Sequence, residues 1–150
     1  MWRAQVRMGM VPYYMFVERD TGPQDYFAVP LARGYEIFRR AYQGVSGLGR
    51  TVRGPSMSAT PGKVCVDGVT DVAGIKAFVL RMIQARDPRL VGTPFFARFD
   101  PAARWLTDLE PVFASRFPWE PPRYEAAADE LPGLWPAAPD EPGELMAPAF

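Results

Sequence analysis

The chain has 150 residues, of which 48% are apolar, and its formal net charge is zero. This composition suits one folded domain or one piece of a larger one, and it gives no reason to expect nucleic acid or an anionic membrane as a partner. The chain contains no histidine and one cysteine, Cys65, which excludes histidine-based catalysis, histidine metal sites, an internal disulfide and multi-cysteine zinc or iron–sulfur motifs within it.

The first residues, Met-Trp-Arg-Ala-Gln-Val-Arg, do not have the pattern of a secretory signal. The apolar run at residues 8–17 is interrupted by Pro12 and is too short to cross a bilayer. We therefore expect a soluble cytoplasmic protein with no membrane partner.

Residues 10–17 form a continuous apolar run of strand length, and the polar cluster at residues 18–23 follows it. A strand that is covered on both faces, as in a parallel sheet, has this pattern. Pro30 then begins a helical pattern that ends at Gly44 or Gly47. Strand, loop and helix in this order predict one α/β unit. The apolar stripe of the helix consists of Leu31, Tyr35, Phe38 and Tyr42.

The middle of the chain predicts shorter elements. Residues 47–62 are rich in Gly, Ser, Thr and Pro, which indicates an ordered loop or an irregular edge segment. The apolar residues 64–66 lead into Asp67-Gly68, a dipeptide typical of a hairpin turn. Residues 75–83 alternate as in a strand. One side of that strand would carry Lys76, Phe78, Leu80 and Met82, and the other Ala77, Val79, Arg81 and Ile83.

A second helix is predicted from Asp100, which suits an N-cap, with Pro101 at the first helical position. Pro111 leaves its end undefined. Its apolar face would consist of Trp105, Leu106, Leu109 and Phe113.

From Pro118 onward the composition changes, because 8 of the 17 prolines and 7 of the 17 acidic residues fall within residues 118–150. This predicts an irregular, acidic tail after a body at residues 1–117. The body contains few predicted elements, whereas an all-apolar strand needs neighbours on both edges and both faces. The sequence therefore has the character of a cut piece of a larger fold.

Two segments resemble the lysine 2,3-aminomutase-like family of radical SAM, PLP-dependent proteins. The first is Met-Val-Pro-Tyr-Tyr-Met-Phe-Val at residues 10–17, followed by Tyr26-Phe27, Pro30-Leu31 and Gly-Tyr-Glu-Ile at residues 34–37, which is similar to a late barrel strand and its helix. The second is Val-Ser-Gly at residues 45–47 with Pro-Gly-Lys-Val at residues 61–64, which is similar to the loop that carries the family's PLP lysine. The resemblance covers roughly residues 3–117.

The resemblance implies an α/β fold that is the C-terminal portion of a partial, open radical SAM β/α barrel, with a small β-rich appendage and the Pro-rich acidic tail. It also implies that Lys63 binds PLP as an imine. The family's [4Fe-4S] cluster and S-adenosylmethionine need a Cys-x-x-x-Cys-x-x-Cys motif that this chain lacks, so both are expected only in a full-length form. The chain alone cannot generate the radical.

The chemistry of Lys63 also supports a role in binding PLP. It is one of only two lysines, the other being Lys76, in a chain that otherwise uses arginine for positive charge. An amine that forms an imine must be neutral, and Arg50 or Arg53 could supply the nearby positive charge that favours this form. The alternative is an ordinary exposed loop lysine. Lys76 is expected to be a solvent-facing side chain.

The chain departs from the family's lysine-specific members in the substrate pocket. Arg19 falls where those members have an aspartate that binds the distal amino group, and it would repel a second ammonium. A one-residue shift of the register would make Asp20 that partner instead. Arg19 and Asp20 are thus the substrate-side candidates, and L-lysine is a doubtful substrate.

Other candidate residues have structural interpretations. Tyr13, Tyr14 and Phe16 are expected in the core rather than in a stack against a cofactor. Cys65 is expected to be a small buried hydrophobe, since no histidine or second thiol is present to activate it.

Two functions follow. The first is a truncated or separated C-terminal segment of a PLP-dependent radical SAM aminomutase, an isomerase that needs the missing N-terminal barrel chain and a small amino-acid substrate. The alternative is a non-catalytic small α/β module that pairs with another protein, or with itself, through the edge of the strand at residues 10–17.

Overall fold

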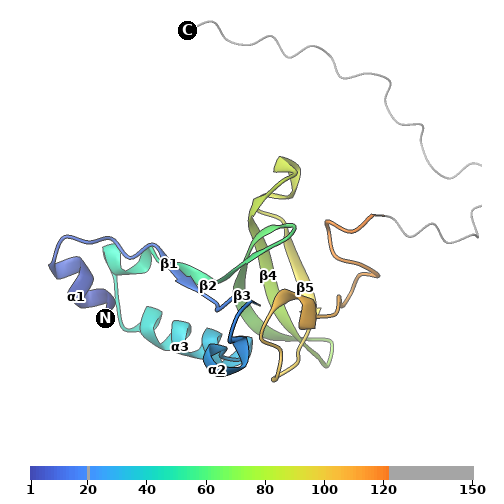
Figure 1. Cartoon of the computed structure of the whole chain (residues 1–150), viewed down its shortest axis with the longest axis horizontal. Helices are drawn as coiled ribbons and strands as arrows, with labels where there is room; N and C mark the ends of the chain where they lie inside the picture. The colour runs from blue at the N-terminus through green and yellow to red at the C-terminus, as the bar shows by residue number, and fades with distance from the viewer. Residues whose placement is uncertain (20, 122–150) are drawn as a thin grey trace, which may run out of the picture. The chain divides into compact units, whose positions relative to one another are not determined.

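A computed structural model describes residues 1–19 and 21–121, and residues 1–120 form one compact unit. The predicted tail at residues 118–150 lies almost wholly outside the described residues. Figure 1 shows the elements in chain order: α1 (Trp2–Arg7), β1 (Tyr14–Phe16), α2 (Gln24–Phe27), α3 (Leu31–Gln43), η1 (Gly47–Arg50), β2 (Arg53–Ala59), β3 (Gly62–Val72), β4 (Ile75–Ala85), η2 (Pro88–Leu90), β5 (Pro94–Arg98) and η3 (Leu106–Asp108).

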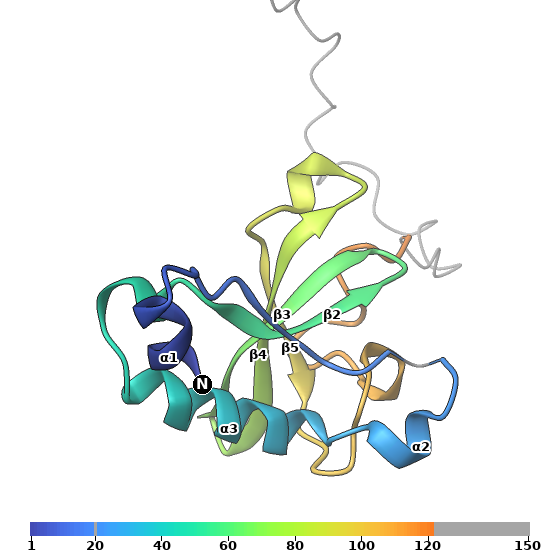
Figure 2. The same ribbon diagram turned by 60° about the vertical axis from the view of Figure 1, so that its left-hand side comes forward.

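The fold is mixed α/β and is built on a five-stranded sheet with the strand order β1-β2-β3-β4-β5. β1 pairs with β2 in parallel, and the α2–α3 segment connects them, as a parallel pair requires. β2 to β5 continue as antiparallel neighbours. α3 packs on β2 and β3 (Figure 2). None of the helices in the described ranges combines the length and hydrophobicity that a bilayer crossing requires.

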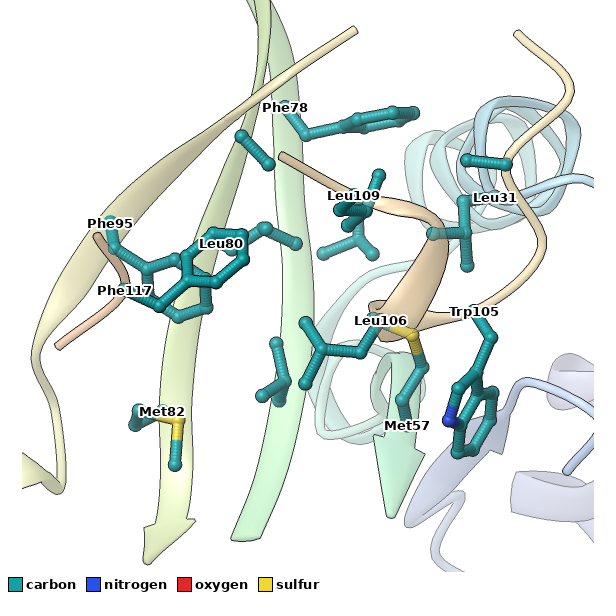
Figure 3. Close-up of a cluster of buried hydrophobic side chains, with 14 residues drawn as sticks. Leu31, Met57, Phe78, Leu80, Met82, Phe95, Trp105, Leu106, Leu109 and Phe117 are labelled. Atoms are coloured by element: carbon teal, nitrogen blue, oxygen red, sulfur yellow. The ribbon is translucent and has the colours of Figure 1, made fainter. Parts of the chain in front are cut away.

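The core lies on one face of the sheet and under the segment that follows β5. Phe78, Leu80 and Met82 alternate along β4 and are fully buried, as the period-2 pattern predicts. Burial of each such side chain contributes about 1.5–3 kcal/mol. Figure 3 shows side chains from the sheet, from α3 and from the segment after β5 meeting in this cluster. The cluster also contains Leu31, Met57, Phe95, Trp105, Leu106, Leu109 and Phe117.

The predicted helix from Pro30 and the predicted strand at residues 75–83 are confirmed. Pro30 is the N-cap of α3 and Gly44 is its C-cap. β4 extends from Ile75 to Ala85.

The strand predicted at residues 10–17 is shorter and less buried than expected. Only Tyr14–Phe16 pair, and they do so along one edge, with β2. The predicted cover on both faces is wrong within the described unit, because Tyr13 is 61% and Phe16 57% exposed. Apolar character alone does not bury a strand when the chain supplies too few elements to cover it.

The prediction of a loop over residues 47–62 is wrong, because β2 occupies Arg53–Ala59 and contributes the fully buried Met57. The small residues of this segment do not form a loop. They allow β2 to approach β1 closely. A Cβ atom on Gly54 would lie 2.3 Å from the carbonyl oxygen of Met15. Tertiary packing thus overrides a low strand propensity.

The predicted hairpin turn at Asp67-Gly68 is also wrong. Val66 pairs with Leu80 and Gly68 with Val79, so Asp67 is an extra residue in a β-bulge within the long strand β3. The turn between β3 and β4 falls at Ala73-Gly74, where both residues have positive φ, 51° and 79°.

The second predicted helix is replaced by a turn and the short 3-10 helix η3. Asp100 accepts a hydrogen bond from the Ala102 N–H at 2.8 Å, as an N-cap would. The backbone carbonyl of Ala103 does not take part in a helix, however, because it accepts a hydrogen bond from the Leu31 N–H of α3 at 2.8 Å. Trp105, Leu106 and Leu109 are still buried. The spacing of these apolar residues therefore reflects their burial in the core and does not indicate a helix.

Candidate functional site

Lys63 is the second residue of β3, not a loop residue as predicted. It lies between Ser58 of β2 and Gln84 of β4. The fully buried Val64 follows it, so Lys63 points away from the core, and it is half-buried. The loop itself is reduced to a tight turn between Ala59 and Gly62.

The amine of Lys63 lies against two rings of β1. Its Nζ atom is 4.5 Å from the ring centroid of Tyr14 and 5.5 Å from that of Phe16. These two rings are stacked with centroids 4.9 Å apart. Within the described residues, no hydrogen bond or ion pair engages this amine, and its contact with the two rings has cation–π geometry.

The strand register places Lys63 at the carboxyl end of β1. Phe16 pairs with Ser56, and Lys63 pairs with Ser58, two residues further along the parallel strand β2. The loop that begins at Val17 emerges at this end. In α/β folds, ligands bind outside the carboxyl ends of parallel strands. We name the surface formed by Tyr14, Phe16, Arg53 and Lys63 the aromatic shelf.

Arg53 lies against the same tyrosine. Its guanidinium carbon is 5.6 Å from the Tyr14 ring centroid and 5.1 Å from that of Tyr13. Its Nη1 donates to the Tyr14 hydroxyl at 3.1 Å and to the Tyr13 hydroxyl at 3.5 Å. The hydrogen bond to Tyr14 raises the pKa of Arg53 above its usual value. Arg53 therefore remains a cation at the Tyr14 ring, which Lys63 also contacts.

Arg50, the other arginine considered for this role, lies elsewhere. Its Nε donates to the Val45 carbonyl at 2.7 Å, and its guanidinium carbon is 5.4 Å from the Tyr42 ring centroid. The structure thus brings one of the two arginines, Arg53, to the ring that Lys63 contacts.

Arg19 is exposed in the loop after β1, where the structure gives it no interaction with the shelf. Asp20 lies outside the described residues. The substrate-side candidates therefore remain sequence predictions.

Tyr14 and Phe16 are the functional candidates that the sequence reading missed. They were expected in the core, whereas Phe16 is exposed and Tyr14 half-buried. Their i, i+2 spacing on a strand, which places both rings on one face, is the signal that could have identified them.

Tyr14 also lines an apolar cleft of about 610 Å³ between α1, β1 and α3. Trp2, Met15 and Ile37 are among its other walls, and Lys63 is not. The aromatic shelf is therefore an open surface at the margin of this cleft rather than an enclosed pocket.

Cys65 is buried as predicted, at 4% exposure. Burial, with the nearby carboxylate of Asp67, raises the pKa of its thiol to about 12. A protonated, buried thiol is a poor nucleophile and a poor metal ligand. In the described part of the chain, no three His, Cys, Asp or Glu side chains gather as a metal site would require. The family's iron–sulfur cluster does not fit this chain.

The side chains of the aromatic shelf fit PLP, which has an aldehyde, a flat ring and a phosphate. Lys63 offers an amine for the aldehyde, and the exposed Phe16 with Tyr14 offers a flat apolar surface. Arg53 offers a guanidinium, the group that suits phosphate best.

Comparison with known proteins gives no match to any family model, to any curated protein or to any solved structure.

Proposed function

We propose that this chain is the C-terminal segment of a PLP-dependent radical SAM aminomutase-like protein of the cytoplasm, and that Lys63 is the residue that holds PLP. One observation carries the proposal. The Pro-Tyr-Tyr strand and the Pro-Gly-Lys segment, which together resemble this family, meet where the Lys63 amine lies 4.5 Å from the Tyr14 ring centroid.

Three residues of the aromatic shelf, Lys63, Tyr14 and Phe16, have defined tasks in this proposal. The Lys63 amine would hold the cofactor through its aldehyde. Tyr14 and Phe16, stacked on each other, support one face of the cofactor ring. When bound, PLP supplies an electron-withdrawing ring for chemistry at an amino-acid substrate.

The chain would act only with a partner that supplies the rest of the barrel. Its single cysteine cannot replace the three that bind the family's cluster. The open edge of β1, near which Tyr13 is 61% and Phe16 57% exposed, is where a further barrel strand would pair. The substrate would be a small amino acid, with Arg19 or Asp20 as the candidate at its distal end. Arg19 in that position would repel the second ammonium of L-lysine, whereas Asp20 would pair with it.

The proposal is tested by titrating the chain with PLP and following the absorbance of the lysine-linked form. Wild type is expected to develop this band with saturation. Lys63→Ala should lose it, and Lys76→Ala should keep it. Lys76 is a matched control because its Nζ also lies over a ring, 4.0 Å from the Phe99 centroid. Equal bands in the two variants would contradict the proposal.

The alternative, a non-catalytic interaction module, is favoured by one observation. β1 is the edge strand of the sheet and its outer side carries exposed apolar residues. An unpaired edge is a template for another strand. This function predicts partner binding that Lys63→Ala leaves unchanged, and no saturable PLP band.

A further inference from the structure

Arg53 has an unused hydrogen-bonding capacity at the aromatic shelf. Nη1 donates to the hydroxyls of Tyr13 and Tyr14. Within residues 1–19 and 21–121, its Nε and Nη2 groups donate to no protein acceptor. These two groups form the planar fork that binds a phosphate through two parallel hydrogen bonds.

The fork is held in position rather than free to move. Two tyrosine rings and two tyrosine hydroxyls contact the guanidinium, although the side chain is exposed. A guanidinium that is already ordered loses less conformational entropy when it binds a ligand. Arg53 is thus a prepared anion-binding group.

Other cations of this region are engaged differently. Arg81 is paired with Asp67, with Nε 2.6 Å from a carboxylate oxygen. Arg50 lies against Tyr42 and the Val45 carbonyl. Arg53 and Lys63 are the two cations that the structure places on the Tyr14 ring, each within 5.6 Å of its centroid.

We propose that Arg53 binds the phosphate of the cofactor that Lys63 holds, so that the shelf selects an aromatic aldehyde carrying an anionic group. This inference rests on the proposed function. The ring of the ligand would lie along Tyr14, with its aldehyde at Lys63 and its phosphate at Arg53. Arg53 is a positioning residue here and takes no part in bond formation.

The test compares PLP with 5′-deoxypyridoxal, which has the same ring and free aldehyde but a methyl group in place of the phosphate ester. The readout is the dissociation constant from the absorbance of the lysine-linked form at fixed pH. Wild type is expected to bind PLP about 10-fold or more tightly than 5′-deoxypyridoxal, since a charge-assisted hydrogen bond is worth about a factor of ten or more. Arg53→Gln should bind both aldehydes equally. Arg50→Gln, the matched arginine control, should keep the wild-type preference.

A second measurement needs no variant. Inorganic phosphate should weaken the binding of PLP to wild type and leave 5′-deoxypyridoxal binding unchanged. The inference is overturned if Arg53→Gln keeps the preference for PLP, or if phosphate weakens both ligands equally. If neither aldehyde links to Lys63 in wild type, the proposed function itself fails, which is a different result from loss of the preference alone.

Discussion

Lys63 and Tyr14 lie far apart in the sequence, yet the amine of one is 4.5 Å from the ring centroid of the other. Two pairings produce this contact. β1 pairs with β2 through Phe16 and Ser56, and β2 pairs with β3 through Ser58 and Lys63. The position of the amine therefore depends on the turn that joins β2 to β3.

Gly62 is the residue of that turn which tolerates no side chain. Its φ is +147°, and a Cβ atom there would lie 2.1 Å from the carbonyl oxygen of Gln84. We expect Gly62→Ala to lower the free energy of unfolding by about 2–3 kcal/mol, because the backbone must shift or strain. Urea denaturation followed by circular dichroism measures this.

Gly44→Ala is the matched control for that experiment. Gly44 has a φ of −81°, and its Cβ would lie 3.5 Å from the nearest atom, an ordinary contact. The free energy of unfolding of the Gly44→Ala variant should stay within about 0.5 kcal/mol of the wild-type value. Equal losses in the two variants would show that β3 does not approach β4 as described.

The buried thiol predicts a pH dependence of stability. Burial raises the pKa of Cys65 to about 12, whereas an exposed thiol titrates at roughly 8.5. Between these values the unfolded chain loses a proton that the folded chain keeps, so stability falls as pH rises, by up to about 1.4 kcal/mol per pH unit. From pH 8 to 10, wild type should lose about 2 kcal/mol more than Cys65→Ala.

Comparison with Cys65→Ala removes the contributions of tyrosines and lysines, which titrate in both proteins. Urea melts at pH 8 and pH 10 supply the four free energies that are needed. If the two proteins lose the same stability over this range, Cys65 is not held protonated by the fold.

The exposed edge of β1 predicts self-association of the isolated chain. Phe16 is 57% exposed on a strand with one free edge, and open apolar edges pair with other chains. The weight-average mass in sedimentation velocity should rise with concentration for wild type. Phe16→Lys should reduce the rise, because an edge lysine opposes strand pairing.

Val91→Lys is the control for that measurement, since Val91 is 52% exposed but lies after η2, away from β1. It should associate as wild type does. A wild-type chain that stays monomeric at all concentrations would count against an unfilled edge and against the cut-barrel interpretation.

The sequence predicted elements well where a local pattern and tertiary packing agree. α3 begins one residue after Pro30, which was predicted at the first helical position, and ends at Gly44, one of the two glycines considered. β4 has the predicted alternation. Prediction from the sequence failed where tertiary packing overrides the local strand propensity. The Gly-, Ser- and Pro-rich β2 is held between β1 and β3, and its strand character comes from those neighbours.

The candidate site was predicted in part. Lys63 was identified from its rarity and from a resemblance, but the rings beneath its amine were assigned to the core. Burial of Tyr14 and Phe16 depends on elements that would cover β1, and a local pattern does not show whether they are present. Arg53 was one of two arginines considered, and only the register of β1 with β2 distinguishes it from Arg50.

The most direct test of the account is to fix the cofactor chemically on the chain. Wild type is incubated with PLP, reduced with borohydride, digested and mapped by mass spectrometry. The account predicts a pyridoxyl group on Lys63, little on Lys76, and none on the Lys63→Ala variant under the same conditions. A modification that is equal on Lys63 and Lys76, or that maps mainly to Lys76 or the N-terminal amine, would contradict it.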